Sequence, residues 1–272
     1  MKPASRNNPQ IPSRRRGVLL LCLCLAPLVA HAALAPETMA AYQKYIATIQ
    51  PRLQAQNHSQ GGFLWIDSDP GRRLAVRNGK IATEKITSLE VPGGMIQHWI
   101  GGEFLPGVTL AQVEQVDQDY AAYAKIYGPD ISNPKVLAHS GENFVVSYRI
   151  TKTKILTAVM DTVHAIEYEP LGSGRLAMQS RSESVRQVDH AGEPSERVLA
   201  EGEGEGFLWA MNSYWRMEER DGGVYVECEA VTLSRGVPFG LGALVNPMLQ
   251  SFAEESLEKT LAAKRQAVQS KQ

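Results

Sequence analysis

Residues 206–234 read GFLWAMNSYWRMEERDGGVYVECEAVTLS, and this stretch decides the fold. Large apolar side chains recur at alternate positions on both sides of Asp221-Gly222-Gly223, which is the pattern of half-buried β-strands. An Asp-Gly-Gly turn between two such runs is a strong signal for a β-hairpin. We therefore expect two antiparallel strands, over 206–219 and 223–234.

Short connections link this hairpin to further strand-like runs on its N-terminal side. Tight turns are predicted around 140–143 and 171–174, and strands joined by tight turns must be antiparallel. A capping-box signature at Thr109–Gln112 predicts the start of a helix between the first strand and the six strands that follow it. The strands expected in the sheet are 95–104, 135–139, 143–151, 155–168, 175–188, 206–219 and 223–234.

A long helix is expected at the end of the chain. Asn246 can cap it, Pro247 suits its first turn, and Glu255 and Lys259 form a favourable i,i+4 pair. One face of a curved sheet is apolar and must be covered, so this helix is its natural cover. The predicted fold class is α+β: a seven-stranded curved antiparallel sheet wrapped around a long C-terminal helix (a helix-grip), with an N-terminal helical extension.

Three segments are predicted along the chain. Residues 1–32 combine a basic start, an apolar run over 18–30 and the triplet Ala30-His31-Ala32, and so predict a cleavable signal peptide. Since a membrane-spanning helix needs about 20 apolar residues, the run is too short to be an anchor, and we expect a periplasmic or secreted protein. Residues 33–91 predict an N-terminal helix over 36–56 and short strands near 63–66 and 73–77, ahead of a helix-grip domain over 92–268.

Composition excludes several classes of function. Loss of residues 1–32 removes five cations and no anion, so the formal charge changes from −1 to −6. Such an acidic domain is a poor partner for nucleic acid, because phosphate contacts need clustered Lys and Arg. Only Cys228 remains, so no intramolecular disulfide forms, and we predict a buried, inert thiol. The histidines have no metal-ligand spacing, and we expect neither metal nor cofactor.

Alternation along the strands predicts which side chains face the final helix. Four acidic residues are taken to mark the outer face of the sheet: Glu103, Asp161, Glu227 and Glu229. On the inner face, bulky aromatic and Met side chains then alternate with small Ser and Ala side chains. This mixture is typical of a ligand pocket and also of a close-packed core, and the pattern leaves both open. The candidate ligand-binding residues are His98, Ile100, Tyr127, Tyr148, Met160, His164, Met178, Trp209, Met211 and Trp215.

Several segments add a resemblance to a known family. They are HWIG with FLPG over 98–107, VDQDY with IYGP over 116–129, YWR over 214–216, EERDGGVY over 218–225, and LSRGVP over 233–238. Together they resemble exported bacterial members of the START/polyketide-cyclase-like helix-grip superfamily (SRPBCC). The resemblance covers residues 92–268 and implies a seven-stranded sheet around a long helix. It also implies a hydrophobic tunnel for lipids, sterols or polyketides, and it transfers no catalytic residue.

These observations lead to one function and two alternatives. The first prediction is non-catalytic binding, and carriage, of a hydrophobic small molecule or lipid, with peripheral membrane contact as a further expectation. The second is a cyclase- or hydrolase-type enzyme in which His98 or His164 acts as a general base; either histidine could equally be a ligand contact or a satisfied core residue. The third is an interaction module with a filled core. The sequence predicts no oligomeric state.

Overall fold

The computed structural model describes residues 34–59, 61–153, 157–236 and 242–271, and side chains of the last helix from residue 253 onward. The predicted signal peptide lies outside the described residues. The helical elements are α1 (Pro36–Asn57), η1 (Trp65–Ser68), α2 (Pro70–Arg77), α3 (Leu110–Asp117), η2 (Tyr120–Ala122), α4 (Tyr123–Ile126) and α5 (Gly242–Gln269). The strands are β1 (Ala82–Val91), β2 (Gly94–Pro106), β3 (Ile131–Ser140), β4 (Asn143–Thr153), β5 (Thr157–Gly172), β6 (Arg175–Asp189), β7 (Arg197–Val198), β8 (Ala210–Arg220) and β9 (Gly223–Arg235).

The strands form one antiparallel sheet in the order β1-β2-β9-β8-β6-β5-β4-β3, with β7 paired to β6. The predicted hairpin is confirmed, since β8 pairs with β9 from Ala210↔Leu233 to Arg220↔Gly223. All seven predicted strands are present in this sheet. The sequence analysis missed β1, which pairs with β2 along the edge and begins within the segment assigned to short strands.

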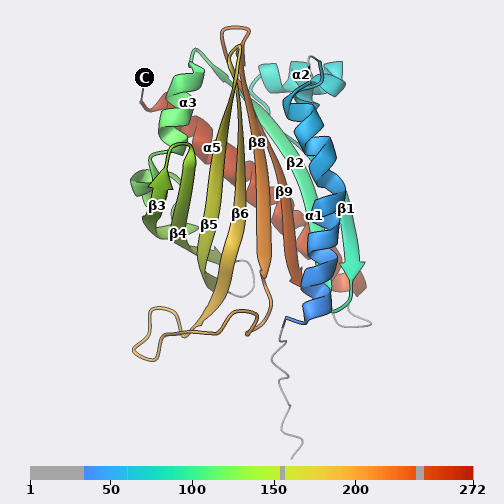
Figure 1. Cartoon of the computed structure of the whole chain (residues 1–272), viewed down its shortest axis with the longest axis vertical. Coiled ribbons are helices and arrows are strands. Elements are labelled where there is room, and N and C mark those ends of the chain that lie inside the picture. The colour runs from blue at the N-terminus through green and yellow to red at the C-terminus, as the bar shows by residue number, and fades with distance from the viewer. Residues whose placement is uncertain (1–33, 60, 154–156, 237–241, 272) are drawn as a thin grey trace, which may run out of the picture. The chain divides into compact units, whose positions relative to one another are not determined.

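Two helical layers cover the sheet (Figure 1). The long helix α5 crosses behind the sheet in the view shown, and α1 runs along its front, over the half that contains β1, β2 and β9. Leu257 and Leu261 of α5 belong to the same core cluster as Trp99, Trp215 and Cys228. Tyr42, Ile49 and Leu53 of α1 pack on Ile96, Tyr214, Val231 and Leu233 from the opposite face. The predicted α+β fold with a helix across the curved sheet is therefore confirmed.

The N-terminal region contains two errors of the sequence analysis. The runs near 63–66 and 73–77 are not strands, because η1 and α2 occupy them. The turn Asp69-Pro70-Gly71 is instead a helix start: the Asp69 carboxylate accepts a hydrogen bond from the Arg72 backbone N–H, and Pro70 begins the first turn. Pro and a capping Asp are favoured at these two positions, so the signal for a helix was present in the sequence.

The face assignment of β2 was also wrong. Glu103 does not mark the outside: it is fully buried on the face covered by α5, where it accepts a hydrogen bond from Arg265 Nε at 2.8 Å. Strand alternation then places His98, Ile100 and Phe104 on the opposite face, under α1 and η1. Glu227 and Glu229 do point to that face as predicted, but α1 and η1 cover them, and both are fully buried.

Candidate functional site

An apolar wall of strand residues faces α5 and forms the largest core cluster. The strands contribute alternate residues, as the pleat requires. Its buried members from β4, β5, β6, β8 and β9 are Phe144, Val146, Ile166, Tyr168, Leu176, Met178, Trp215, Met217, Val224, Val226 and Cys228. Leu257, Leu261 and Val268 of α5 complete this cluster, so the half of the inner face beside the C-terminal part of α5 is filled by protein side chains.

The other half of the inner face is only half-buried, and we call it the inner patch. Its members are Tyr148, Ser182, Met211, Ser213, Ala230 and Thr232. The outward-facing neighbours on the same strands, Asn212, Tyr214 and Val231, are buried under α1, so the accessible surface belongs to the side that faces α5. Tyr148, Ser213 and Ala230 therefore keep accessible surface at mid-strand positions of the inner face.

The inner patch has members on four strands, β4, β6, β8 and β9, and His164 of β5 lies between Tyr148 and Ser182. Ser213 pairs with Ala230, and Met211 pairs with Thr232. Ser182 Oγ accepts a hydrogen bond from the Met211 backbone N–H at 2.9 Å, which joins β6 to β8. On its other side, Ser182 pairs with His164 of β5. The patch is therefore a single surface of small, hydroxyl-bearing and apolar side chains.

His164 lies under the Tyr148 ring at one end of the inner patch. The two rings stack with centroids 4.7 Å apart and planes 8° apart. Burial lowers the pKa of His164 to about 4, so the imidazole is neutral at physiological pH. Ser180 Oγ lies 3.5 Å from Nδ1, whereas Nε2 is buried with no hydrogen-bond partner. Nε2 is therefore the nitrogen of the neutral ring whose hydrogen-bonding capacity the protein leaves unused.

Tyr127 reaches into the same interior from the end of α4. Burial raises the pKa of its hydroxyl well above the usual value, and the nearby Asp117, Glu103, Cys228 and Tyr148 add to that increase. The Tyr127 ring contacts the Tyr123 ring edge-on, with centroids 5.1 Å apart. The Tyr127 side chain is half-buried.

Two buried ion pairs fix α5 near its C-terminal end. Lys264 Nζ lies 2.7 Å from Asp117 Oδ1 and 3.7 Å from the centre of the Trp215 ring, and both charged side chains are 1% exposed. Arg265 pairs with Glu103, whose pKa burial raises to about 8 although Arg265 opposes the shift. Each of these two basic side chains of α5 therefore has an acidic side chain as its partner within the protein.

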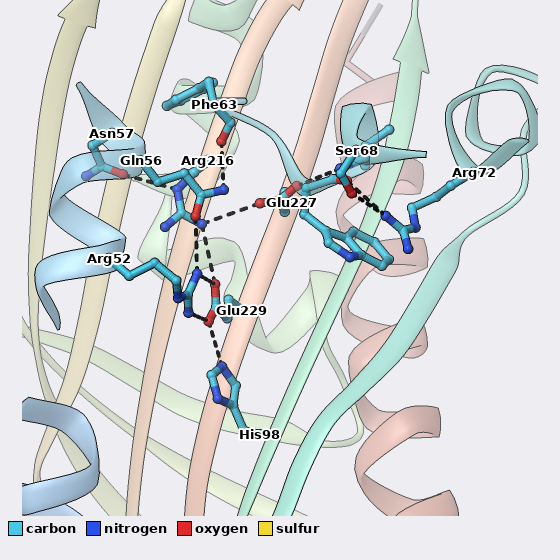
Figure 2. Close-up of polar contacts among 12 residues, drawn as sticks. Arg52, Gln56, Asn57, Phe63, Ser68, Arg72, His98, Arg216, Glu227 and Glu229 are labelled. Carbon is cyan, nitrogen blue, oxygen red and sulfur yellow. Dashed lines mark hydrogen bonds and ion pairs between the residues drawn. The ribbon is translucent and has the colours of Figure 1, made fainter. Parts of the chain in front are cut away.

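A separate polar cluster lies on the outer face, beneath α1 (Figure 2). Glu229 Oε1 is 2.6 Å from His98 Nε2, Arg52 of α1 donates to the same carboxylate, and Tyr45 Oη is 2.6 Å from His98 Nδ1. Burial alone would raise the pKa of Glu229, but hydrogen bonds from His98 and Arg52 lower it to about 2. Arg216, 1% exposed, lies 3.4 Å from Glu227 and 3.6 Å from Glu229.

This outer cluster explains how α1 is held, and none of its described buried side-chain polar atoms lacks a hydrogen-bond partner. Asn57 at the end of α1 accepts from Arg216 Nε at 3.1 Å and donates to Glu169 at 3.1 Å. Two recesses of about 320 and 470 Å³ open beside α1 on this face. The larger has a mostly polar lining that includes Gln50, Gln54, Asn57, His58, Glu167, Glu169 and Gln179.

The structure divides the ten predicted site residues between the two faces. Seven lie on the face covered by α5 and its adjoining helices: Tyr127, Tyr148, Met160, His164, Met178, Met211 and Trp215. His98, Ile100 and Trp209 do not, so their predicted place on the inner face is wrong. For Trp209 the reason is that β8 begins at Ala210, so alternation does not extend to residue 209, and the indole packs with Tyr42 and Ile96.

The two histidines therefore lie on opposite sides of the sheet and cannot act on one substrate together. The sequence analysis also did not single out Ser213, Ala230 and Thr232 as contacts, although alternation with Trp215 and Cys228 places them on the inner face. Ser184, predicted inside, is displaced by a β-bulge: Ser182 pairs with His164 but Ser184 pairs with Val163.

Two features are absent from the described residues, a membrane-spanning helix and a cluster of metal ligands. None of the helices in these ranges is long and apolar enough to cross a membrane. Across the same ranges, no group of three or more His, Cys, Asp or Glu side chains is arranged to hold a metal ion.

The comparisons with known proteins found similar folds among solved structures and no similar sequence. No protein-family model matches the chain, and no curated protein matches its sequence. Among solved structures, a STAR-related lipid transfer protein from Xanthomonas axonopodis shares 15% identity at a TM-score of 0.45, covering 69% of this chain and 98% of that one. The arrangement described above, with a long helix across a curved antiparallel sheet, is of the helix-grip type.

Other similar structures include an aromatase/cyclase and a human protein. The Zhui aromatase/cyclase from Streptomyces sp. R1128 shares 14% identity at a TM-score of 0.42, covering 64% of this chain and 94% of that one. Human STARD10 shares 14% identity at a TM-score of 0.41, covering 72% and 79%. These similarities concern the arrangement of helices and strands alone, and they transfer no ligand or activity.

Proposed function

We propose that this protein binds an apolar small molecule or lipid between the sheet and α5, in contact with the inner patch. The observation that supports the proposal is the partial exposure of Tyr148, Ser213 and Ala230, which occupy mid-strand positions next to buried residues. A ligand that covers apolar surface removes it from water, and this favours binding by about 25 cal/mol for each Å² covered.

Non-catalytic binding fits this surface better than the histidine-dependent alternative does. His98 is already bound on both nitrogens by Tyr45 and Glu229 on the outer face. His164 has no carboxylate among its hydrogen-bond partners, and the neighbours that contact it are Tyr148 and Ser180. Carriage between membranes is part of the proposal, with peripheral membrane contact as its expected consequence.

Ligand extraction tests the proposal directly. Protein purified without detergent is extracted with organic solvent and compared by mass spectrometry with the variant Ala230→Trp, which fills the inner patch. A matched Arg186→Trp variant places the same ring on an exposed position of β6. We expect an apolar compound to co-purify with the wild type and Arg186→Trp and to be lost from Ala230→Trp. Equal recovery from all three proteins, or none from any, contradicts the proposal.

We further propose that the protein is exported and acts in the periplasm or outside the cell. The basic start, the apolar run and the small-x-small triplet of residues 1–32 support this. The intact mass of the protein recovered from a periplasmic fraction should correspond to a chain that begins at Ala33. A full-length chain retained in the cytoplasm contradicts the proposal.

A further inference from the structure

The polar groups of the inner patch are uncharged. Ser182, Ser213 and Thr232 provide aliphatic hydroxyls and Tyr148 provides a phenolic one, and Tyr127, which is not part of the patch, provides a second phenolic hydroxyl. The pKa of Tyr148 is raised by burial, and burial also raises that of Tyr127, so neither hydroxyl ionises at physiological pH. His164 beneath Tyr148 is neutral, since burial lowers its pKa to about 4.

The residues that face α5 from the five strands β4, β5, β6, β8 and β9 are also uncharged, as alternation along these strands shows. The inward positions of β4 from Phe144 to Ile150, of β6 from Leu176 to Ser182 and of β9 from Val224 to Thr232 contain no charged residue. The same is true of β5 from Ala158 to Tyr168 and of β8 from Met211 to Met217.

The charged side chains that do face the interior are matched by counter-charges. Lys264 pairs with Asp117, Arg265 pairs with Glu103, and Lys152 pairs with Asp130 at 2.6 Å. Among the described residues, the inward positions of β4, β5, β6, β8 and β9 named above carry no cation that could receive an anionic headgroup.

This distribution of charge selects among apolar ligands. An ionised carboxylate or phosphate moved into such a surface loses its hydration and gains no counter-ion, which is strongly unfavourable. A hydroxyl or a carbonyl needs only one or two neutral hydrogen bonds, which tyrosine and serine hydroxyls can provide. We propose that the ligand is a neutral amphiphile with a hydroxyl or carbonyl group, and neither a fatty-acid anion nor a phospholipid; this inference rests on the proposed function above.

Two probes with the same hydrocarbon chain test the inference. Binding of 1-tetradecanol and of tetradecanoate is measured at pH 8, where the acid is ionised, by displacement of bound Nile red from the full chain. We expect the alcohol to bind at least ten-fold more tightly. Equal or tighter binding of tetradecanoate overturns the inference and leaves the proposed function standing. Displacement by neither probe, with no binding of Nile red, overturns the proposed function as well.

Hydroxyl deletions locate the polar contact. Tyr127→Phe and Tyr148→Phe each remove one phenolic oxygen and keep the ring, so we expect 3- to 10-fold weaker binding of 1-tetradecanol in at least one of them, as loss of one hydrogen bond predicts. Binding of the hydrocarbon tetradecane should be unchanged. Tyr45→Phe is the matched control, because its hydroxyl bonds His98 on the outer face. Unchanged binding of the alcohol in both inner variants overturns the assignment of the polar contact.

Discussion

His164 and Tyr148 lie face to face on the inner side of the sheet, with ring centroids 4.7 Å apart and planes inclined by 8°. The stack removes the imidazole from water, and the desolvation lowers the pKa of His164 from 6.5 to about 4. Folding therefore favours the neutral ring, and the unfolded chain takes up the proton first as the pH falls. The stability that His164 contributes is present above pH 6.5 and is lost as the pH falls toward 4.

Replacement of His164 by Phe should remove this pH dependence. Between pH 7.5 and pH 5, linkage predicts that protonation of His164 costs the wild type about 2 kcal/mol of unfolding free energy. The variant His164→Phe keeps a ring for the Tyr148 stack and has no titrating group. Urea unfolding at both pH values should show a loss that is smaller by about 2 kcal/mol in the variant. An identical loss in both proteins would assign the acid sensitivity to other groups.

The Arg216 guanidinium should be essential for the outer layer. It is 1% exposed and lies within 3.6 Å of both Glu227 and Glu229. Arg216→Met leaves two carboxylates buried side by side with less compensation, and loss of one partner from a buried ion pair costs about 3–5 kcal/mol. Arg181→Met, on an exposed position of β6, should change the unfolding free energy by less than about 0.5 kcal/mol. A cost below about 1 kcal/mol for Arg216→Met would refute this role.

The ion pair between Lys264 and Asp117 should behave as one unit. Both side chains are 1% exposed, so Lys264→Met strands a buried carboxylate and should cost about 3–5 kcal/mol. The double variant Lys264→Met, Asp117→Asn removes the stranded charge and should recover at least about 2 kcal/mol of that loss. Chemical denaturation of the wild type, both single variants and the double variant gives the coupling energy; additive losses would show that the two residues are independent.

The parts of the fold that the sequence predicted depend on local interactions. The β8–β9 hairpin depends on Asp221-Gly222-Gly223, and the start of α3 on the capping box of Thr109 and Gln112; both are confirmed. Their geometry is determined by residues within a few positions of one another. The place of α5 against the sheet followed from the need to cover an apolar face.

The errors arose where a partner lies far away in the chain. Glu103 was assigned to solvent because a carboxylate is costly to bury, but its partner Arg265 lies 162 residues later. Glu229 is likewise buried through Arg52, 177 residues earlier. Neither pairing leaves a local signal in the sequence. His98 and Ile100 were assigned to the wrong face of the sheet for this reason, because an error of one residue in the alternation moves every side chain of the strand to the opposite face.

Two consecutive glycines in β2 let both helical layers approach the sheet, and this close approach predicts the effect of one substitution. A Cβ at Gly102 would lie 2.5 Å from Ile66 Cδ1 of η1, and one at Gly101 would lie 3.0 Å from Leu257 Cδ2 and 3.1 Å from Leu261 Cδ1 of α5. Gly101→Val should therefore force α5 outward at the point where it closes the filled half of the inner face. Overpacking of this kind costs about 1–3 kcal/mol.

The matched control for this substitution is Gly61→Val, because a Cβ at Gly61 would meet nothing within 4 Å. It should shift the unfolding free energy by less than about 0.5 kcal/mol. Urea denaturation followed by tryptophan fluorescence reports both effects, since Trp99 and Trp215 lie in the cluster that contacts Leu257 and Leu261. If Gly101→Val is as stable as the wild type, α5 does not depend on close approach to β2 for its position, and the room above the inner patch is not fixed by this contact.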